Sequence, residues 1–369
     1  MKESVENNSE FIEQHLDRVS RSFAFCIRQL PEPLKRWVGV SYLLCRIVDT
    51  IEDSEFSSPD SQARAFDWFD RSITEGFSVD EGSSNYPKEL WPQALTSGEA
   101  QLLEEAQRVF EIFWGMDEEA RERVSKLAFS MSQGMRHFRM RSTEPLRLKD
   151  LKEVNQYCFF VAGLVGEMLA GFVSQVEPKF TMTVSRVLRA HHFGLFLQKV
   201  NLLKDQLKDQ KLGRFLVPSR GELERSAHEN ATEALQFLTE LPLEQVEFRR
   251  FCAWSLFMGV ESLKVASKGF KSGVSKKLTR PKTDELLMQV EESLADNSKL
   301  RELFDQSSDG LGWAPRSVTA SVNDLRKELE PSADRIVPVR IPEEKSPSWL
   351  FKIYKGHLEP QNMMALGIS

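Results

Sequence analysis

Helical periodicity runs through most of the first 300 residues and decides what this chain can fold into. Apolar residues recur every three to four positions, and no segment shows the sustained two-residue alternation of a half-buried strand. The sequence therefore predicts an all-α protein. The predicted helices cover roughly residues 10–29, 33–53, 61–75, 97–113, 117–140, 149–175, 181–209, 228–240, 243–268 and 281–297.

The pattern changes after about residue 300, where prolines become frequent. We therefore expect one all-α domain over residues 1–300 and a loosely packed, Pro-rich C-terminal tail over 301–369. The tail is expected either to dock on the domain through its aromatic and apolar residues or to be mobile. These residues are Trp349, Leu350, Phe351 and Tyr354.

Charge and cysteine content exclude several classes of protein. The formal net charge is −6, which argues against a nucleic-acid partner because that function needs a basic surface. The four cysteines lie far apart, so neither a zinc site nor a disulfide framework is indicated, and a reducing compartment is expected. They are Cys26, Cys45, Cys158 and Cys252.

Targeting and membrane signals are weak. The polar, acidic N-terminus does not resemble a signal peptide. The longest apolar run, residues 157–173, contains Glu167 and falls short of the ~20 residues that span a bilayer. We expect a buried core helix there, no transmembrane anchor, and a cytoplasmic location.

The first candidate site is an acidic cluster at the end of an apolar helix. Asp49, Glu52 and Asp53 are spaced i, i+3 and i+4, which would place them on one helix face. Oxygen ligands at this spacing suit Mg²⁺, which keeps several waters and bridges to substrate phosphates. The alternative interpretation is an ordinary solvated helix end.

A second apolar helix ends in the same way. Asp205 and Asp209 are four residues apart, and Asn201 lies one turn before them. Two such helices facing each other would form an apolar cavity with carboxylates at its rim, which suits a long hydrocarbon diphosphate bound through Mg²⁺. An exposed helix end of mixed charge is the alternative. Among the basic residues, Arg46 is the best candidate for a phosphate contact, because it lies one turn before Asp49 on an otherwise apolar helix.

Several motifs together resemble the squalene/phytoene synthase family, in particular its eukaryotic-type squalene synthases. The resemblance spans about residues 10–297, and the motifs stand in the family's order. They are residues 20–24 (SRSFA), 42–53 (YLLCRIVDTIED), 157–166 (YCFFVAGLVG), 194–199 (GLFLQK) with Asn201 and 205–209 (DQLKD), 213–214 (GR), 251–253 (FCA) and, more weakly, 270–277 (FKSGVSKK).

This resemblance implies an isoprenoid synthase helical bundle with a central apolar cavity. It implies a farnesyl-diphosphate farnesyltransferase that condenses two farnesyl diphosphates head to head through presqualene diphosphate and then reduces the product to squalene, a sterol or hopanoid precursor, with NADPH. Mg²⁺ and NADPH are the implied cofactors. Peripheral membrane contact is expected because the product is so apolar. Neither the oligomeric state nor the role of the tail follows from the sequence.

The resemblance also implies roles for individual residues. The implied metal ligands are Asp49, Glu52, Asp53, Asp205 and Asp209. The implied catalytic residues are Tyr157, which is matched to proton removal, together with Tyr42 and Arg46. The implied substrate-binding residues are Arg21, Ser20, Phe23, Lys199, Arg214, Gln198 and Val165, and the implied NADPH-binding residues are Asn201, Lys271, Lys276 and Lys277.

Two departures from the family pattern leave alternatives open. Lys208 stands where the second acidic motif normally carries a carboxylate, so it contacts diphosphate, turns outward or cripples the second half-reaction. In the cofactor loop, Ser275 replaces a lysine and Lys277 an arginine. The alternatives are therefore a presqualene diphosphate or C30 alkene synthase without NADPH, and a non-catalytic isoprenoid-binding homologue.

Overall fold

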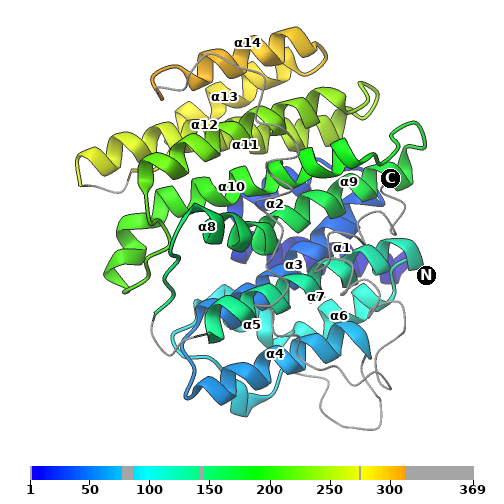
Figure 1. The fold of residues 1–369 in the computed structure, drawn as a ribbon. Coiled ribbons are helices and arrows are strands. Elements are labelled where there is room, and N and C mark those ends of the chain that lie inside the picture. The colour runs from blue at the N-terminus through cyan, green and yellow to red at the C-terminus, as the bar shows by residue number, and fades with distance from the viewer. Residues whose placement is uncertain (1, 77–85, 142–144, 274–275, 312–369) are drawn as a thin grey trace. The chain divides into compact units, whose positions relative to one another are not determined.

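The computed structural model describes residues 2–76, 86–141, 145–273 and 276–311 (Figure 1). Within these ranges there is no strand, and only isolated bridges occur, between Glu55 and Gln93 and between Arg147 and Phe215. The all-α prediction is confirmed. The chain divides into two compact units: unit 1 is described over residues 2–141 and unit 2 over residues 145–311.

Unit 1 is organised around one apolar helix, α3. Its helices are α1 (Lys2–Val19), α2 (Arg21–Ile27), α3 (Leu34–Asp53), α4 (Pro59–Thr74), a 3₁₀ turn η2 (Lys88–Leu90), α5 (Ser97–Glu104), α6 (Ala106–Trp114) and α7 (Glu118–Met140). Helix α3 packs against α1, α4, α6 and α7, so apolar residues on several of its sides are buried. Burial on several sides is the arrangement expected for a helix with a broad apolar face.

Side-chain caps explain where several helices of unit 1 begin. Ser58 and Asp117 accept hydrogen bonds from the first-turn N–H groups of α4 and α7. Thr96 and Glu99 form a capping box at the start of α5. At the C-terminal end of α3, the Gln62 amide donates to the carbonyls of Ile51 (2.7 Å) and Glu52 (3.1 Å). These bonds satisfy carbonyl groups that a helix end leaves open.

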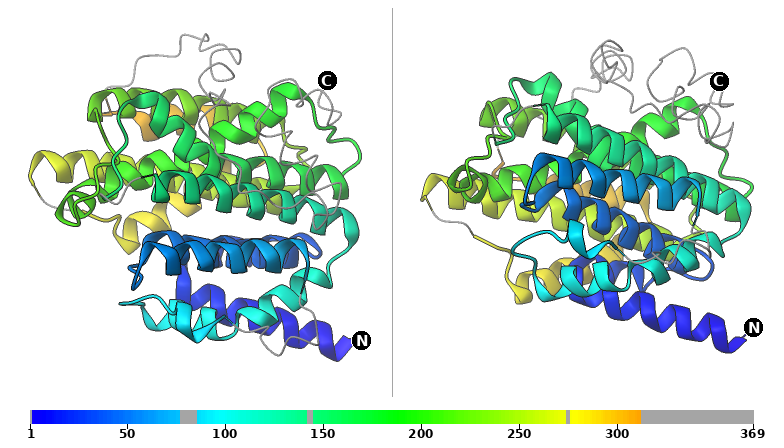
Figure 2. Two further views of the ribbon diagram at one scale, coloured as in Figure 1. Left: turned by 60° about the horizontal axis from the view of Figure 1, so that its bottom comes forward. Right: turned by 90° about the horizontal axis from the view of Figure 1, so that it is seen from below.

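Unit 2 is organised around the longest helix, α10. Its elements are α8 (Leu151–Cys158), a π-helical turn η3 (Phe159–Gly163), α9 (Leu164–Val176), α10 (Val184–Lys211), α11 (Arg220–Glu240), α12 (Val246–Lys271), α13 (Arg280–Ser293) and α14 (Asn297–Ser308). Helix α10 packs against α9, α11 and α12, and the views of Figure 2 show these green to yellow helices side by side.

Glycines allow the α8–η3–α9 segment to touch α10 backbone to backbone. A Cβ atom on Gly166 would lie 1.9 Å from the Ala190 carbonyl oxygen, and one on Gly194 would lie 2.0 Å from the Ala162 carbonyl oxygen. No side chain fits at such distances. The crossing therefore requires glycine at both positions, one on each helix.

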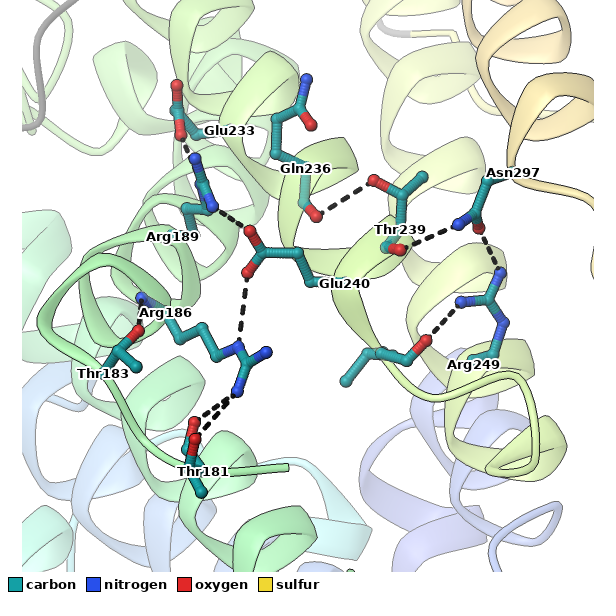
Figure 3. Close-up of polar contacts among 11 residues, drawn as sticks. Thr181, Thr183, Arg186, Arg189, Glu233, Gln236, Thr239, Glu240, Arg249 and Asn297 are labelled. Atoms are coloured by element: carbon teal, nitrogen blue, oxygen red, sulfur yellow. Dashed lines mark hydrogen bonds and ion pairs between the residues drawn. The ribbon is translucent and has the colours of Figure 1, made fainter. Parts of the chain in front are cut away.

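A buried arginine joins the C-terminal helices of unit 2 (Figure 3). Arg249 is fully buried and donates to the main-chain carbonyls of Leu238, Leu241 and Leu294 and to the Asn297 side chain, at 2.7–3.3 Å. Figure 3 shows the bond to Asn297. These carbonyls lie at the ends of α11 and α13, where helical partners are missing. Nearby, Glu240 forms ion pairs with Arg186 and Arg189.

Helix boundaries differ from the prediction where local caps interrupt the periodicity. The predicted helix over 10–29 is two helices, because Ser20 caps the start of α2. Helix α11 begins at Arg220, earlier than predicted, and α14 was not predicted although Asp296 caps it. The predicted boundary at residue 300 falls inside α14, where Leu303 and Phe304 are buried. The tail beyond residue 311, including residues 349–354, lies outside the described residues.

One segment of the described residues, Leu151–Val176, is long and apolar enough to cross a membrane. It is longer than the predicted apolar run, because α8, η3 and α9 continue one another. However, 61% of its most apolar window is buried within the protein. Core helices of globular proteins have the same composition, so the prediction of a buried core helix is the interpretation that this burial favours.

Candidate active site

In unit 1, the candidate residues cluster along one side of α3. Tyr42, Arg46, Asp49 and Asp53 follow one another at intervals of three or four residues, which places them in a row along the helix. The Phe23 ring of α2 lies 5.6 Å from the Tyr42 ring, centroid to centroid. Ser20 and Phe23 of α2 are therefore brought to the Tyr42 end of this row. Arg21 begins α2, but its side chain lies outside the described residues.

The electrostatics of this row are dominated by burial. Burial raises the pKa of the Asp49 carboxyl to about 7; Arg46 opposes this shift, whereas Asp53 and Glu99 add to it. Burial also raises the pKa of the Tyr42 hydroxyl, against a hydrogen bond with Ser20 and the charge of Arg46. A bound cation would favour the ionised form of Asp49. The surroundings of this carboxyl group therefore suit a bound metal ion.

The three carboxylates of the first acidic motif do not share one environment. Asp49 is half-buried, Glu52 is buried and Asp53 is exposed. In the ranges that the structure describes, no group of three or more acidic, histidine or cysteine side chains is arranged to hold a metal ion. Within the described residues the three carboxylates therefore do not form one group arranged to hold a metal ion, and their shared direction stays a prediction. Asp49 and Asp53 still fit Mg²⁺, which commonly takes one or two carboxylates plus waters and phosphate oxygens.

Arg46 has a partner that the sequence did not reveal. Its Nη2 donates to Glu99 Oε1 at 2.5 Å, across 53 residues of sequence. The motif Thr96-Ser97-Gly98-Glu99 is recognisable as a capping box. Nothing in that motif, however, indicates which residue its carboxylate would meet.

In unit 2, the candidate residues of the second motif lie on the last turns of α10. Asp205 is 43% exposed and its carboxylate is 3.7 Å from Lys204 Nζ. Asp209 is half-buried, and Lys208 is exposed. Asn201 Oδ1 accepts a hydrogen bond from Lys204 Nζ at 2.9 Å.

The turn after α10 places Arg214 close to the second motif. Gly213 has φ +77°, a left-handed conformation that favours glycine, and it lets the Arg214 N–H donate to the Asp209 carbonyl at 2.8 Å. Arg214 is half-buried and lines a small hollow together with Gln206 and Asp209. The structure therefore brings Arg214 and Asp209 together.

Lys199 is fully buried and hydrogen-bonded within unit 2. Its Nζ donates to Ser226 Oγ and to Asn230 Oδ1, both at 2.6 Å. Asn230 also contacts His192 Nδ1 at 2.7 Å. Burial, with a smaller contribution from the charge of Lys199, lowers the pKa of His192 to about 3, so this imidazole is neutral. These two bonds use two of the three donors of the Lys199 ammonium group.

The remaining candidates of unit 2 lie on α8, α9, α10 and α12, except that Lys276 and Lys277 lie between α12 and α13. Tyr157 is buried at the end of α8, whereas Val165 on α9 and Gln198 on α10 are half-buried. Lys271, Lys276 and Lys277 are all exposed, and residues 274–275 between them lie outside the described residues. Exposed ammonium groups suit the phosphates of a nucleotide.

Comparison with known proteins identifies the family. The sequence pattern of the squalene/phytoene synthases matches residues 16–230, which is more than half of the chain. The chain belongs to the squalene/phytoene synthase family. Squalene synthase LSS of Botryococcus braunii is 32% identical over 200 residues, covering 54% of this chain and 39% of the relative. The squalene synthase of Schizosaccharomyces pombe is 26% identical over 289 residues, covering 71% of this chain and 60% of the relative.

Solved structures of squalene/phytoene synthases share the fold. A TcSQS chain in complex with the ligand E5700 superposes with a TM-score of 0.67 at 18% identity, covering 97% of this chain and 98% of that chain. A dehydrosqualene synthase in complex with a ligand gives 0.55 at 18% identity, covering 79% of this chain and 98% of that chain. The predicted isoprenoid synthase fold is confirmed. The chain spans 39–60% of the length of the two curated relatives.

Proposed function

We propose that the protein is a farnesyl-diphosphate farnesyltransferase that joins two farnesyl diphosphates head to head. The family match over residues 16–230 carries this proposal, because it includes both acidic motifs and the α8–α9 segment. In the proposed reaction the C1–O bond of one substrate breaks and diphosphate leaves as an allylic cation forms. The double bond of the second substrate attacks that cation, and loss of one proton closes the cyclopropane of presqualene diphosphate.

Magnesium is the cofactor that these acidic motifs fit. Asp49 and Asp53 in unit 1, and Asp205 and Asp209 in unit 2, are the carboxylates proposed to hold it, and buried Glu52 is the weakest of the predicted ligands. When bound, Mg²⁺ neutralises the departing diphosphate and so lowers the barrier to ionisation.

Basic and aromatic residues of the chain provide the rest of the proposed chemistry. Arg46 and Arg214 are half-buried cations next to acidic motifs and are proposed to bind diphosphate oxygens. Tyr157 is buried, and it is proposed to assist removal of the proton that closes the cyclopropane. Burial of such groups keeps water away from the carbocation.

The proposal is tested by incubating the protein with farnesyl diphosphate and Mg²⁺, then measuring released diphosphate and analysing the lipid extract by mass spectrometry. We expect Mg²⁺-dependent release of diphosphate and a presqualene diphosphate or C30 product. No release at any Mg²⁺ concentration would refute the proposal.

We further propose that NADPH reduces the product to squalene. The exposed Lys271, Lys276 and Lys277 and the amide of Asn201 are the groups that would hold its phosphates, and the bound cofactor supplies a hydride. The test compares products with and without NADPH. Squalene only in the presence of NADPH supports this step, whereas the same product in both reactions means that the chain stops at presqualene diphosphate or at a C30 alkene.

The exposure of Lys208 favours an enzyme over a non-catalytic binding protein. The Lys208 side chain is exposed to solvent at the end of α10, where water screens its charge. We also propose peripheral contact with lipid, since both substrate and product are apolar. Cosedimentation of the protein with phosphatidylcholine vesicles tests this contact, and a protein that stays in the supernatant contradicts it.

A further inference from the structure

The N-terminus of α5 holds a carboxylate in a fixed place in unit 1. Glu99 Oε2 accepts hydrogen bonds from the Thr96 N–H (2.9 Å) and from Thr96 Oγ1 (2.7 Å), and the Glu99 N–H donates to Thr96 Oγ1 (3.3 Å). Neighbouring Gly98 fits closely against α1, since a Cβ there would lie 2.8 Å from the Arg18 carbonyl oxygen. The helix start is therefore fastened both by its own cap and by packing.

The other oxygen of this carboxylate binds Arg46. The distance from Arg46 Nη2 to Glu99 Oε1 is 2.5 Å, and the two side chains are 30% and 17% exposed. Burial raises the pKa of Glu99, but hydrogen bonds from Thr96 and the charge of Arg46 outweigh it and hold this pKa below its usual value. Glu99 is thus an ionised carboxylate with one oxygen for the helix cap and one for the arginine.

Arg46 keeps donors that the described residues do not use. Its Nε is buried and has no hydrogen-bond partner among them. An unsatisfied buried donor is costly, so such a group indicates a missing acceptor. Arg46 also lies one turn from both Tyr42 and Asp49, which belong to the candidate active site.

We propose that Glu99 is a positioning residue for substrate binding: it grips one edge of the Arg46 guanidinium so that the remaining donors face the diphosphate of the prenyl substrate. This inference rests on the proposed function for the identity of the ligand. A planar guanidinium held on one edge loses little further freedom when it binds phosphate oxygens on the other. The competing possibility is that Glu99 sequesters Arg46 and weakens binding.

A double-mutant cycle between Glu99→Gln and Arg46→Ala separates these possibilities. Glutamine at this position preserves a capping box while it removes the charge that attracts Arg46. The probe is inorganic diphosphate with Mg²⁺, titrated calorimetrically into the full chain. We expect Glu99→Gln to weaken diphosphate binding about ten-fold in the otherwise unchanged protein and less than about two-fold in the Arg46→Ala background.

Matched variants exclude a general loss of stability. Glu119→Gln removes a surface ion pair with Arg123 on α7 and should leave diphosphate affinity unchanged. Glu99→Asp keeps the charge but shortens the reach to Arg46, so it should weaken binding as Glu99→Gln does. If Glu99→Gln fails to fold, Glu99→Asp is used in its place in the double-mutant cycle. Equal effects of Glu99→Gln in both backgrounds, tighter binding after Glu99→Gln, or no diphosphate binding by the unsubstituted protein each overturn the inference.

Turnover of farnesyl diphosphate is measured on the same variants. This measurement tests the proposed function separately from the role of Glu99. If Glu99 is a positioning residue, it acts through substrate binding. The factor by which Glu99→Gln raises KM should then be about ten times the factor by which it lowers kcat. If the unsubstituted protein has no turnover but the binding cycle is non-additive, the proposed function fails and the role of Glu99 stands. If turnover is present but the cycle is additive, only the role of Glu99 fails.

Discussion

The most deeply buried charged side chains of the two units differ in sign. Unit 1 encloses carboxyl groups, Asp49 near the end of α3 and Asp70 on α4, and burial raises the pKa of both to about 7. Unit 2 encloses basic groups, with Lys199 on α10 and Arg249 on α12 fully buried. Two apolar helices that end in similar acidic motifs, α3 and α10, therefore stand in different electrostatic surroundings. Similar local sequence does not imply a similar environment for the carboxylates.

The largest expected effect comes from replacing Asp49 in unit 1. Replacing Asp49 with Asn removes a proposed metal ligand, so turnover of farnesyl diphosphate should fall by about 10³-fold, or roughly 4 kcal/mol of transition-state stabilisation. The same change removes a half-buried charge and should slightly raise the thermal unfolding temperature. The control is Asp67→Asn, at a partly exposed ion pair with Arg136. Turnover within ten-fold of the unsubstituted protein would contradict the assignment of Asp49.

The buried cation of unit 2 should matter for stability instead. Arg249→Met removes all the hydrogen bonds to three carbonyl groups and to Asn297, and leaves those buried acceptors unpaired. We expect a loss of about 3–4 kcal/mol in the free energy of unfolding. Arg250→Met breaks only a partly exposed ion pair with Glu291 and should cost about 1 kcal/mol or less. Urea unfolding of both variants makes the comparison, and equal losses would contradict the role of Arg249.

The buried titratable groups of the two units predict opposite responses to pH. The pKa of Asp70 is raised to about 7 by burial, so the stability that this group contributes is present at acidic pH and lost as pH rises through 7. The pKa of His192 is lowered to about 3 by burial, so its contribution is present above about pH 6.5 and lost as pH falls. Each response has an upper limit of about 4–5 kcal/mol.

Urea unfolding between pH 5 and 8 measures these responses. Asp70→Asn should remove part of the decline in stability as pH rises from 5 to 7, and His192→Asn should remove part of the decline as pH falls from 6.5 to 5. Pairs of curves that stay parallel to those of the unsubstituted protein would show that these groups do not titrate as their burial implies.

The smallest expected effect is at Lys208. Because this side chain is exposed, Lys208→Glu should change turnover by less than about three-fold. The matched substitution Lys211→Glu, at the next exposed lysine of α10, serves as the control. A gain of turnover from near zero in Lys208→Glu would instead mean that the lysine spoils the second acidic motif.

Sequence periodicity predicted the long helices well, because each of them buries a broad apolar surface. Helix α3 was predicted over 33–53 and observed at Leu34–Asp53, and α10 was predicted over 181–209 and observed at Val184–Lys211. The short polar helix α14 was missed because only a few of its residues are buried. Its cap, Asp296, and the short apolar stripe of Leu300, Leu303 and Phe304 were readable, but a stripe of three residues is a weak signal on its own.

The candidate site was predictable only within each motif. The spacing in α3 correctly placed Arg46 beside Asp49, but it could not show that Glu52 is buried or that Glu99 meets Arg46. Contacts between residues far apart in sequence depend on how helices pack, and packing is not encoded in any local spacing. The Lys199–Asn230 contact was missed for the same reason.

The π-helical turn between α8 and α9 has a consequence for side-chain direction. In an uninterrupted α-helix, Tyr157 and Val165 would be rotated about 80° from each other, since each residue turns the chain by ~100°. A wider turn at Phe159–Gly163 accommodates one additional residue and removes roughly one such step, which leaves the two side chains only about 20° apart. Deleting a single residue from this turn would restore a regular α-helix there, and the later side chains of α9 would keep their present directions relative to α8.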